Sequence, residues 1–280
     1  MIDFSCKISL LKEKRDSSPE YGDIIDYTVG LYTFLSGHAS ETGITVPVPT
    51  DDTATRNGFP LLSPDSLIVD EGVTTRFITL LVDHLISLGR EGGEFLERLS
   101  TSLAPTPPHW IPLFNAILTR DRRPIDTAAG CLGIPSPLFE YILEIPLKTA
   151  LELAASNIDP ARFCGWKEAI CPLCGARPGI ASFEGEEGKR YLYCSTCSTR
   201  WEFSRLRCPY CGCEDREKLS YFLVDTDRVR VDTCKGCSRA IKTVDRRKGG
   251  VESRMPPDIL DVVTMHLDLL ASREGFERGR

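Results

Sequence analysis

The sequence lacks two features that would place the protein in or across a membrane. No stretch approaches the ~18–20 uninterrupted apolar residues of a membrane-spanning helix, so we expect no membrane span. The first seven residues, Met1 to Lys7, place no apolar run behind a basic start, so we expect no signal peptide. Both absences favour a soluble, cytoplasmic protein.

Several motifs of common enzymes are also missing. The chain contains no Gly-x-x-x-x-Gly-Lys-Ser/Thr phosphate loop, no dinucleotide-binding fingerprint, no Gly-x-Ser-x-Gly elbow and no His-Glu-x-x-His pair. Asp51 and Asp52 are adjacent acids in a proline-rich segment, where a solvated turn is the better interpretation than an acid/base pair. The sequence therefore predicts a protein that is not an enzyme, with no catalytic and no cofactor-binding residue.

Residues 1–160 contain apolar side chains at helical spacing, and we interpret them as the core of an all-α domain. The three clearest stripes are Phe77, Leu80, Leu81, Leu85 and Leu88; Phe95, Leu96 and Leu99; and Trp110, Leu113, Phe114, Ile117 and Leu118. Ser136 before Pro137 resembles the N-cap of a further helix, and Pro146 predicts a kink or a new helix. We predict an ordered loop from Thr42 to Pro64 and a last helix over residues 256–272.

The cysteines are the most informative residues of the chain. Eight of the twelve form four Cys-x-x-Cys pairs between residues 171 and 237. Without an export signal this pattern favours metal binding over disulfides. Two residues between the cysteines let a tight turn aim both sulfurs at one ion, and a second pair completes a tetrahedron of thiolates. The predicted ligands are Cys171, Cys174, Cys194 and Cys197 for one ion, and Cys208, Cys211, Cys234 and Cys237 for the other.

These pairs belong to an internal repeat. Each unit begins with an opening pair (Cys171/Cys174 or Cys208/Cys211) and ends with a closing pair (Cys194/Cys197 or Cys234/Cys237). The opening pairs are 37 residues apart and the closing pairs 40. Pairing in sequence order leaves shorter loops than cross-pairing would. A glycine with positive φ is predicted after each opening pair, at Gly175 and Gly212. Each unit has room for a hairpin and a further strand. The predicted elements are strands Ile180–Phe183, Tyr191–Tyr193 and Trp201–Phe203 in the first unit; in the second they are Leu219–Val224, a turn at Asp225–Asp227, Val229–Val231 and Ala240–Val244.

The predicted fold class is therefore α+β and multidomain. An all-α N-terminal domain (residues 1–165) precedes two small rubredoxin-like or zinc-ribbon-like four-cysteine β modules (166–205 and 206–250). A C-terminal helix and tail (251–280) complete the chain.

The kind of ion follows in part from what the cysteine-rich segment lacks. All four histidines (His38, His84, His109 and His266) lie outside it, so both sites have cysteine ligands only. Four thiolates suit zinc and iron alike and close the coordination sphere, which argues against metal-assisted hydrolysis. Of the other cysteines, Cys213 is interpreted as a structural thiol or a reserve ligand. We call the tight turn formed by each Cys-x-x-Cys pair a knuckle. Cys164 lies too far from Cys171 to belong to the same knuckle, and Cys6 and Cys131 are predicted to be buried small apolar residues.

The formal charge of −6 hides an uneven distribution. Residues 161–250 contain 18 Lys and Arg against 12 Asp and Glu, hence +6, and the remainder carries −12. A basic segment is typical of proteins that bind nucleic acid or an acidic partner. Each divalent ion bound by four thiolates adds −2, however, so two loaded sites reduce the segment to about +2. The basic excess largely balances the metal sites, and we expect no nucleic-acid partner.

One family shares more than the knuckles. The strings Cys171-Pro-Leu-Cys174-Gly-Ala-Arg-Pro178, Arg190-Tyr-Leu-Tyr-Cys194-Ser-Thr-Cys197, Thr199-Arg-Trp201 and Arg205-Leu-Arg207-Cys208 resemble the formate dehydrogenase accessory protein, FdhE, over roughly residues 165–245. Outside this range, the short string Gly58-Phe-Pro60-Leu-Leu also resembles the FdhE family. The resemblance implies a helical domain before two rubredoxin-like modules, iron as the metal, and a cytosolic maturation role with the molybdenum- or tungsten-containing catalytic subunit of formate dehydrogenase as partner.

Three interpretations of the function stay open at this point. The first is an accessory factor whose metal modules stabilise a partner-binding surface. The second is an electron carrier, because iron bound by four thiolates can cycle between two oxidation states. The third is a nucleic-acid-binding ribbon, supported by the arginines but not by a platform of interleaved aromatic residues. The sequence leaves self-association open.

Overall fold

The computed structural model describes residues 2–89, 92–103, 107–224 and 226–279. The chain forms two compact units, and each is assembled from three separate segments. Unit 1 joins Met1–Ser5, Asp26–Pro49 and Leu62–Asn157; unit 2 joins Cys6–Ile25, Thr50–Leu61 and Ile158–Arg280. The cysteine-rich part thus shares its unit with two segments from the N-terminal half. The domain boundaries drawn from the sequence, at 165, 205 and 250, stay a prediction.

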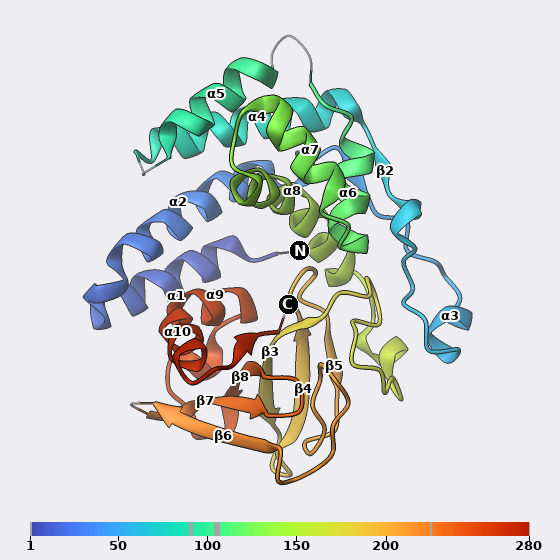
Figure 1. Cartoon of the computed structure of the whole chain (residues 1–280), viewed down its shortest axis with the longest axis vertical. Helices are drawn as coiled ribbons and strands as arrows, with labels where there is room; N and C mark the ends of the chain where they lie inside the picture. Colours follow the sequence, from blue (N-terminus) through green and yellow to red (C-terminus); the bar gives the residue numbers. More distant parts are fainter. Residues whose placement is uncertain (1, 90–91, 104–106, 225, 280) are drawn as a thin grey trace. The chain divides into compact units, whose positions relative to one another are not determined.

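Unit 1 is helical (Figure 1). Its elements are α2 (Gly22–His38, which begins in unit 2), the short strands β1 (Ile44–Thr45) and β2 (Ile68–Val69), α4 (Glu71–Ser87), α5 (Gly93–Leu103), α6 (Trp110–Thr119), α7 (Arg123–Leu132) and α8 (Ser136–Ser156). The Asp70 carboxylate accepts a hydrogen bond from the amide of Val73 and caps α4. Phe77, Trp110 and Phe139 are almost fully buried and supply large side chains to the core. Among the described helices of the chain, none is both long and apolar enough to cross a bilayer.

The helical stripes predicted from the sequence are confirmed in their main features, with two corrections. Leu80 is 42% exposed and does not belong to the core. Pro135, not Ser136, occupies the cap position of α8, and no side chain caps this end. Of the two outcomes predicted at Pro146, the new helix is excluded, because α8 continues through this residue. Apolar residues on both sides of Pro146 are buried, and their packing outweighs the one lost backbone hydrogen bond.

Unit 2 contains most of α1 (Phe4–Ser17), the one-turn helix α3 (Thr53–Arg56) and a seven-stranded sheet. The strands are β3 (Pro178–Glu184), β4 (Lys189–Cys194), β5 (Arg200–Glu202), β6 (Leu219–Val224), β7 (Thr226–Cys234), β8 (Arg239–Asp245) and β9 (Glu277–Arg278). Both predicted hairpins and both further strands are present. β6 has the predicted bounds, while the other bounds differ by one to three residues. Of the predicted turn between β6 and β7, Asp225 lies outside the described residues.

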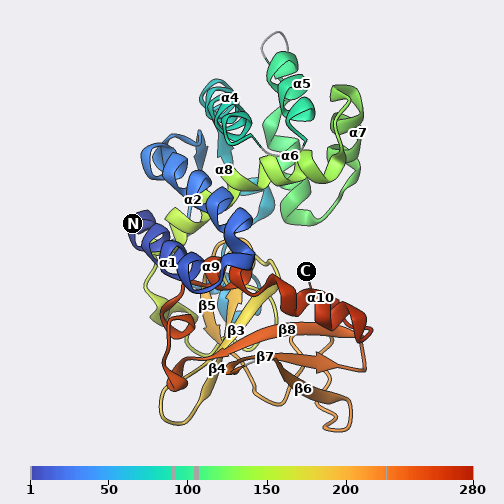
Figure 2. The same ribbon diagram turned by 90° about the vertical axis from the view of Figure 1, so that its left-hand side faces the viewer.

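The two hairpins form one sheet, a connection that the sequence analysis did not predict. The strand order is β5-β4-β3-β8-β7-β6, and β3 pairs with β8 in parallel, from Ile180 opposite Lys242 to Phe183 opposite Asp245. β9 pairs with the first residues of β8, also in parallel. The last strand of the second repeat therefore lies beside the first strand of the first repeat (Figure 2).

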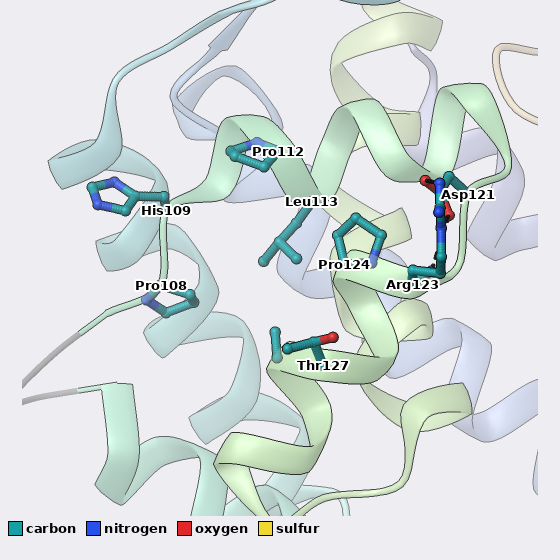
Figure 3. A pocket seen from close by; sticks show the side chains of 9 residues that line it. Pro108, His109, Pro112, Leu113, Asp121, Arg123, Pro124 and Thr127 are labelled. Atoms are coloured by element: carbon teal, nitrogen blue, oxygen red, sulfur yellow. Dashed lines mark hydrogen bonds and ion pairs between the residues drawn. The ribbon is translucent and has the colours of Figure 1, made fainter.

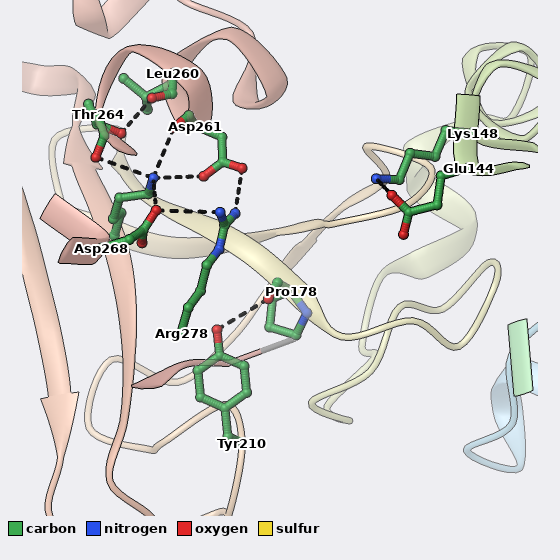
Figure 4. Close-up of polar contacts among 10 residues, drawn as sticks. Glu144, Lys148, Pro178, Tyr210, Leu260, Asp261, Thr264, Asp268 and Arg278 are labelled. Carbon is green, nitrogen blue, oxygen red and sulfur yellow. Dashed lines mark hydrogen bonds and ion pairs between the residues drawn. The ribbon is translucent and has the colours of Figure 1, made fainter. Parts of the chain in front are cut away.

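The predicted C-terminal helix is two helices, α9 (Pro257–Val263) and α10 (Met265–Arg273). The break at Thr264 has a visible cause in Lys242 of β8, whose side chain is only 1% exposed. Its Nζ donates to the carbonyl oxygens of Asp261 and Thr264 and forms ion pairs with the carboxylates of Asp261 at 2.7 Å and Asp268 at 2.8 Å. A buried ammonium group needs these acceptors, and it takes them from the helix backbone at the break. Arg278 joins the same two carboxylates (Figure 4).

Candidate metal centres

The structure brings the eight predicted cysteines together in two groups of four, in sequence order. Within each group all four sulfurs lie within 4.8 Å of one another. Sulfur–sulfur separations between contacting cysteines are 3.4–3.5 Å in the first group and 3.7 Å in the second. A disulfide needs about 2.05 Å, whereas a metal–sulfur bond of ~2.3 Å in a tetrahedron gives sulfur–sulfur edges of about 3.8 Å. The geometry fits one ion per group, and it excludes the disulfide interpretation and cross-pairing.

Each opening knuckle is closed by the same two backbone hydrogen bonds. The bonds are Cys171 N to Ala176 O and Cys208 N to Cys213 O, both 2.8 Å, and Gly175 N to Cys171 O and Gly212 N to Cys208 O, both 3.0 Å. Gly175 and Gly212 have φ of +74° and +73°, as predicted, because the chain must reverse within a few residues. Sequence reasoning missed the counterpart in the closing knuckles, where Ser198 and Ser238 also have positive φ.

The first centre is enclosed by protein. All four of its cysteines are at most 8% exposed. Backbone amides donate to two of its sulfurs: Leu173 and Cys174 to Cys171 Sγ, and Thr196 and Cys197 to Cys194 Sγ. Such bonds stabilise thiolate charge without adding a ligand.

The cover of the first centre comes from far away in the sequence. The amide of Leu61 donates to the carbonyl of Pro172 inside the opening knuckle at 2.9 Å. A side chain at position 175 would lie 3.1 Å from the ring of Pro60. The segment Gly58–Leu62, which resembles FdhE locally, therefore includes two residues that pack on the first knuckle.

The second centre is partly open. Cys208 and Cys234 are buried, Cys237 is half-buried and Cys211 is exposed. Tyr210, inside the opening knuckle, donates its hydroxyl hydrogen to the carbonyl of Pro178 at the start of β3 (Figure 4). This contact ties the second knuckle to the first hairpin.

A buried arginine supports the assignment of negative charge to the second centre. Arg190 of β4 is 4% exposed, and its Nη1 donates to the carbonyl of Arg207, next to Cys208. Its Nε and Nη2 have no hydrogen-bond partner, and the nearest carboxylate, Asp232, lies 3.6 Å away and is shared with Arg230. Burial lowers the pKa of Arg190, while Asp232, and to a smaller extent Cys208, favour its charge. Four thiolates around a divalent ion would carry −2, a counter-charge beyond that of Asp232, which Arg190 shares with Arg230.

The metal-free thiols of the first centre share their protons unevenly. Donation of its hydrogen to Cys171 and other neighbouring sulfurs raises the pKa of Cys174. Burial alone would raise the pKa of Cys194, but the three neighbouring thiols that donate to its sulfur lower it well below the usual range. A bound cation would replace these protons and hold all four groups as thiolates.

The remaining cysteines correct one prediction. Cys6 and Cys131 are exposed, as is Cys164, so the first two are not buried apolar residues. Cys213 is half-buried beside the second centre. A Cβ at Gly236 would lie 3.5 Å from Cys234 Sγ and 3.7 Å from Cys213 Sγ. Cys213 is nevertheless not one of the four clustered sulfurs.

Unit 1 contains a separate open hollow of about 540 Å³ between α6 and α7 (Figure 3). Pro112, Leu113 and Pro124 contribute apolar walls, and the paired Asp121 and Arg123 lie at its rim. No thiol lines it, so it adds no ligand to either centre.

The fold and the eight cysteines define a class: a protein with a helical unit and a unit that carries two ribbon-type four-cysteine centres. Comparison with known proteins narrows this class. The family model described as the central domain of FdhE matches residues 170–205. A protein FdhE homolog of Pseudomonas putida is 30% identical over 239 residues, covering 79% of this chain and 68% of the relative. The chain belongs to the FdhE family.

Other comparisons agree with this assignment. A protein FdhE homolog of Aquifex aeolicus is 37% identical over 115 residues, 40% of each chain. The matches to the first curated relatives span about two fifths of their length. The crystal structure of the FdhE protein from Pseudomonas aeruginosa has the same fold, with a TM-score of 0.65 at 18% identity over 98% of this chain and 93% of that one.

Proposed function

We propose that this chain is a non-catalytic accessory factor for the maturation of formate dehydrogenase, that it acts in the cytoplasm, and that its partner is the catalytic subunit of that enzyme. The observation that carries the proposal is the pair of four-cysteine centres in a chain of the FdhE family. Four protein ligands fill a tetrahedral coordination sphere, so neither ion would have an open position for a substrate.

In this proposal the eight cysteines bind two metal ions, and the ions are iron. Cys171, Cys174, Cys194 and Cys197 hold one, and Cys208, Cys211, Cys234 and Cys237 the other. When bound, the ions cross-link each hairpin to its two knuckles, which contributes folding free energy on the order of 10 kcal/mol per centre. The protein residues supply the rest: amide donors to the first centre and Arg190 beside the second.

The test is complementation in a host that carries this chain as its only copy. Cys171→Ser/Cys174→Ser should lower metal content and abolish formate dehydrogenase activity, and the catalytic subunit should no longer co-purify. Cys131→Ser and Cys164→Ser change exposed cysteines outside the centres and should leave all three readouts unchanged. Full enzyme maturation by the double variant would refute the proposal.

A second candidate, an electron carrier, is favoured by one observation. Cys211 is an exposed residue, and a ligand residue at the protein surface shortens the path for electrons to a partner. Anaerobically purified protein should then contain two irons and show a reversible visible thiolate band on mild reduction. Two zinc ions without a redox response would eliminate this candidate and the assignment of iron, and would leave the accessory role intact.

A further inference from the structure

Three arginine side chains surround one buried phenylalanine in unit 2. Phe183 of β3 is 3% exposed. The guanidinium carbons of Arg230, Arg205 and Arg247 lie 4.5, 5.0 and 6.0 Å from the centre of its ring. The arginines come from β7, from the segment after β5 and from the turn after β8, so the fold itself brings these three charges together. We call these three residues the arginine cradle.

Gly188 has no side chain, and this leaves the space in which the guanidinium groups of Arg205 and Arg247 converge. Gly188, in the turn between β3 and β4, has a φ of +62°. A Cβ at this position would collide with Nη1 of Arg247 and would lie 3.4 Å from Nη1 of Arg205. Arg205 Nη1 also donates to the carbonyl of Glu187 in the same turn. Two guanidinium groups thus approach one point where the chain has no side chain.

The charges of the cradle are not balanced. Arg247 makes a two-pronged pair with Asp245, and Arg230 pairs with Asp232 at 2.8 Å. Arg205 is exposed and has no carboxylate partner among the residues that the structure describes. Two like charges at short range repel, and an anion between them converts that repulsion into attraction. The planar N–H fork of arginine matches the two oxygens of a carboxylate.

We propose that the arginine cradle is a docking site for carboxylate side chains of an acidic segment in the partner protein. This inference rests on the accessory role proposed above and assigns it a contact surface. A carboxylate fits better than a nucleic acid for two reasons. Nucleic acids need several phosphate contacts, whereas the loaded segment keeps only about +2 in net charge. In addition, Phe183 is buried under the guanidinium groups and offers no face on which bases could stack.

The experiment uses the full-length, metal-loaded protein with fluorescent hexaglutamate as the probe and fluorescent hexaglutamine as its neutral counterpart. Fluorescence anisotropy should detect hexaglutamate binding that weakens with salt, and no hexaglutamine binding. Arg205→Gln should weaken binding about tenfold. The control Arg216→Gln removes an exposed arginine outside the cradle and should change affinity less than twofold, a limit that we set from the small effect of exposed charges.

Gly188→Ala separates the cradle from general electrostatics. It keeps every charge but places a methyl group where the two guanidinium groups converge, so hexaglutamate binding should weaken as it does in Arg205→Gln. Equal affinities for the wild type, Arg205→Gln and Gly188→Ala would overturn the proposal. So would an oligothymidylate of similar charge that displaces hexaglutamate at lower concentration.

The outcome in cells separates this inference from the proposed function. Arg205→Gln should reduce co-purification of the catalytic subunit while metal content stays at the wild-type value. Unchanged co-purification and enzyme maturation by Arg205→Gln, together with loss of maturation in Cys171→Ser/Cys174→Ser, would overturn the cradle and support the accessory role.

Discussion

The two four-cysteine centres have the same local pattern and very different surroundings. Both opening knuckles are closed by the same pair of backbone hydrogen bonds and are followed by a glycine with positive φ. The first centre is buried, with Pro60 and Leu61 packed on it, and receives four amide hydrogen bonds, while the second receives the corresponding bond from Tyr210 N to Cys208 Sγ. The second leaves Cys211 exposed and has Arg190 beside it.

This difference teaches that the knuckle sequence sets the geometry of a centre but not its accessibility. Cover and counter-charge come from segments outside the knuckles, whereas the amide hydrogen bonds to the sulfurs come from residues within them. We therefore expect the first centre to support the whole sheet and the second to exchange its metal more readily. Two predictions test this division of roles, and a third tests the attachment of the shared sheet to the C-terminal helices.

The largest effect is expected from removing ligands of one centre at a time. Cys171→Ser/Cys174→Ser should lose both metals, because the first centre anchors β3, which pairs with β8 and receives the hydrogen bond of Tyr210. Cys208→Ser/Cys211→Ser should lose one metal and keep the first centre folded. Each lost centre removes folding free energy on the order of 10 kcal/mol. Metal content per chain and far-ultraviolet circular dichroism measure the outcome, and equal losses in the two variants would contradict the comparison.

A smaller effect is expected at Arg190. Arg190→Gln removes the buried charge beside the second centre, which costs roughly 1.5–3 kcal/mol for a charged hydrogen-bonding group. Metal release to a chromogenic chelator should have a slow phase from the first centre and a fast phase from the second, and only the fast phase should accelerate, about tenfold. Arg190→Lys keeps the charge and should show a smaller change. Acceleration of both phases would show that Arg190 acts on the fold in general.

The smallest effect concerns the attachment of β8 to the C-terminal helices. Burial works against the charge of Asp261, but Lys242 and Arg278 outweigh it and hold its pKa below the usual range. Because the pKa is lowered in the folded protein, this stabilisation is fully present at neutral pH and is lost as the pH falls through the lowered pKa. Asp261→Asn should lower the urea midpoint at pH 7, and its difference from the wild type should shrink toward pH 4 and below. A constant difference would show that the charge of Asp261 contributes nothing.

Much of this protein was predictable because the decisive signals are local. Cys-x-x-Cys spacing, a following glycine and alternating strands between the pairs act over a few tens of residues. The eight cysteines, their pairing, the four strands of the two hairpins and the two further strands therefore follow from the sequence. The helical stripes are equally local, and their error at Leu80 arises where the tertiary packing leaves a residue of the stripe exposed.

The signals that failed were the ones that depend on neighbours distant in the chain. Cys6 and Cys131 look like small apolar residues by type, yet neither is covered by another segment. Tyr221 is a large aromatic residue of a predicted strand, yet it is 57% exposed, because it lies on β6 at the edge of the sheet. The single C-terminal helix that the sequence predicts is interrupted at Thr264. There Lys242, more than 20 residues earlier in the chain, donates a hydrogen bond to the carbonyl oxygen of Thr264.

The sequence by itself thus determined which eight cysteines cluster and the local geometry of both centres, since covalent spacing alone aims neighbouring sulfurs at one point. Only the tertiary structure decided that the two hairpins share one sheet, that Pro60 and Leu61 cover the first centre, and that Arg190 reaches the second. These outcomes depend on contacts between segments tens to more than a hundred residues apart. Packing must offset the loop-closure entropy of such contacts, and no local sequence pattern indicates which segments will pack together.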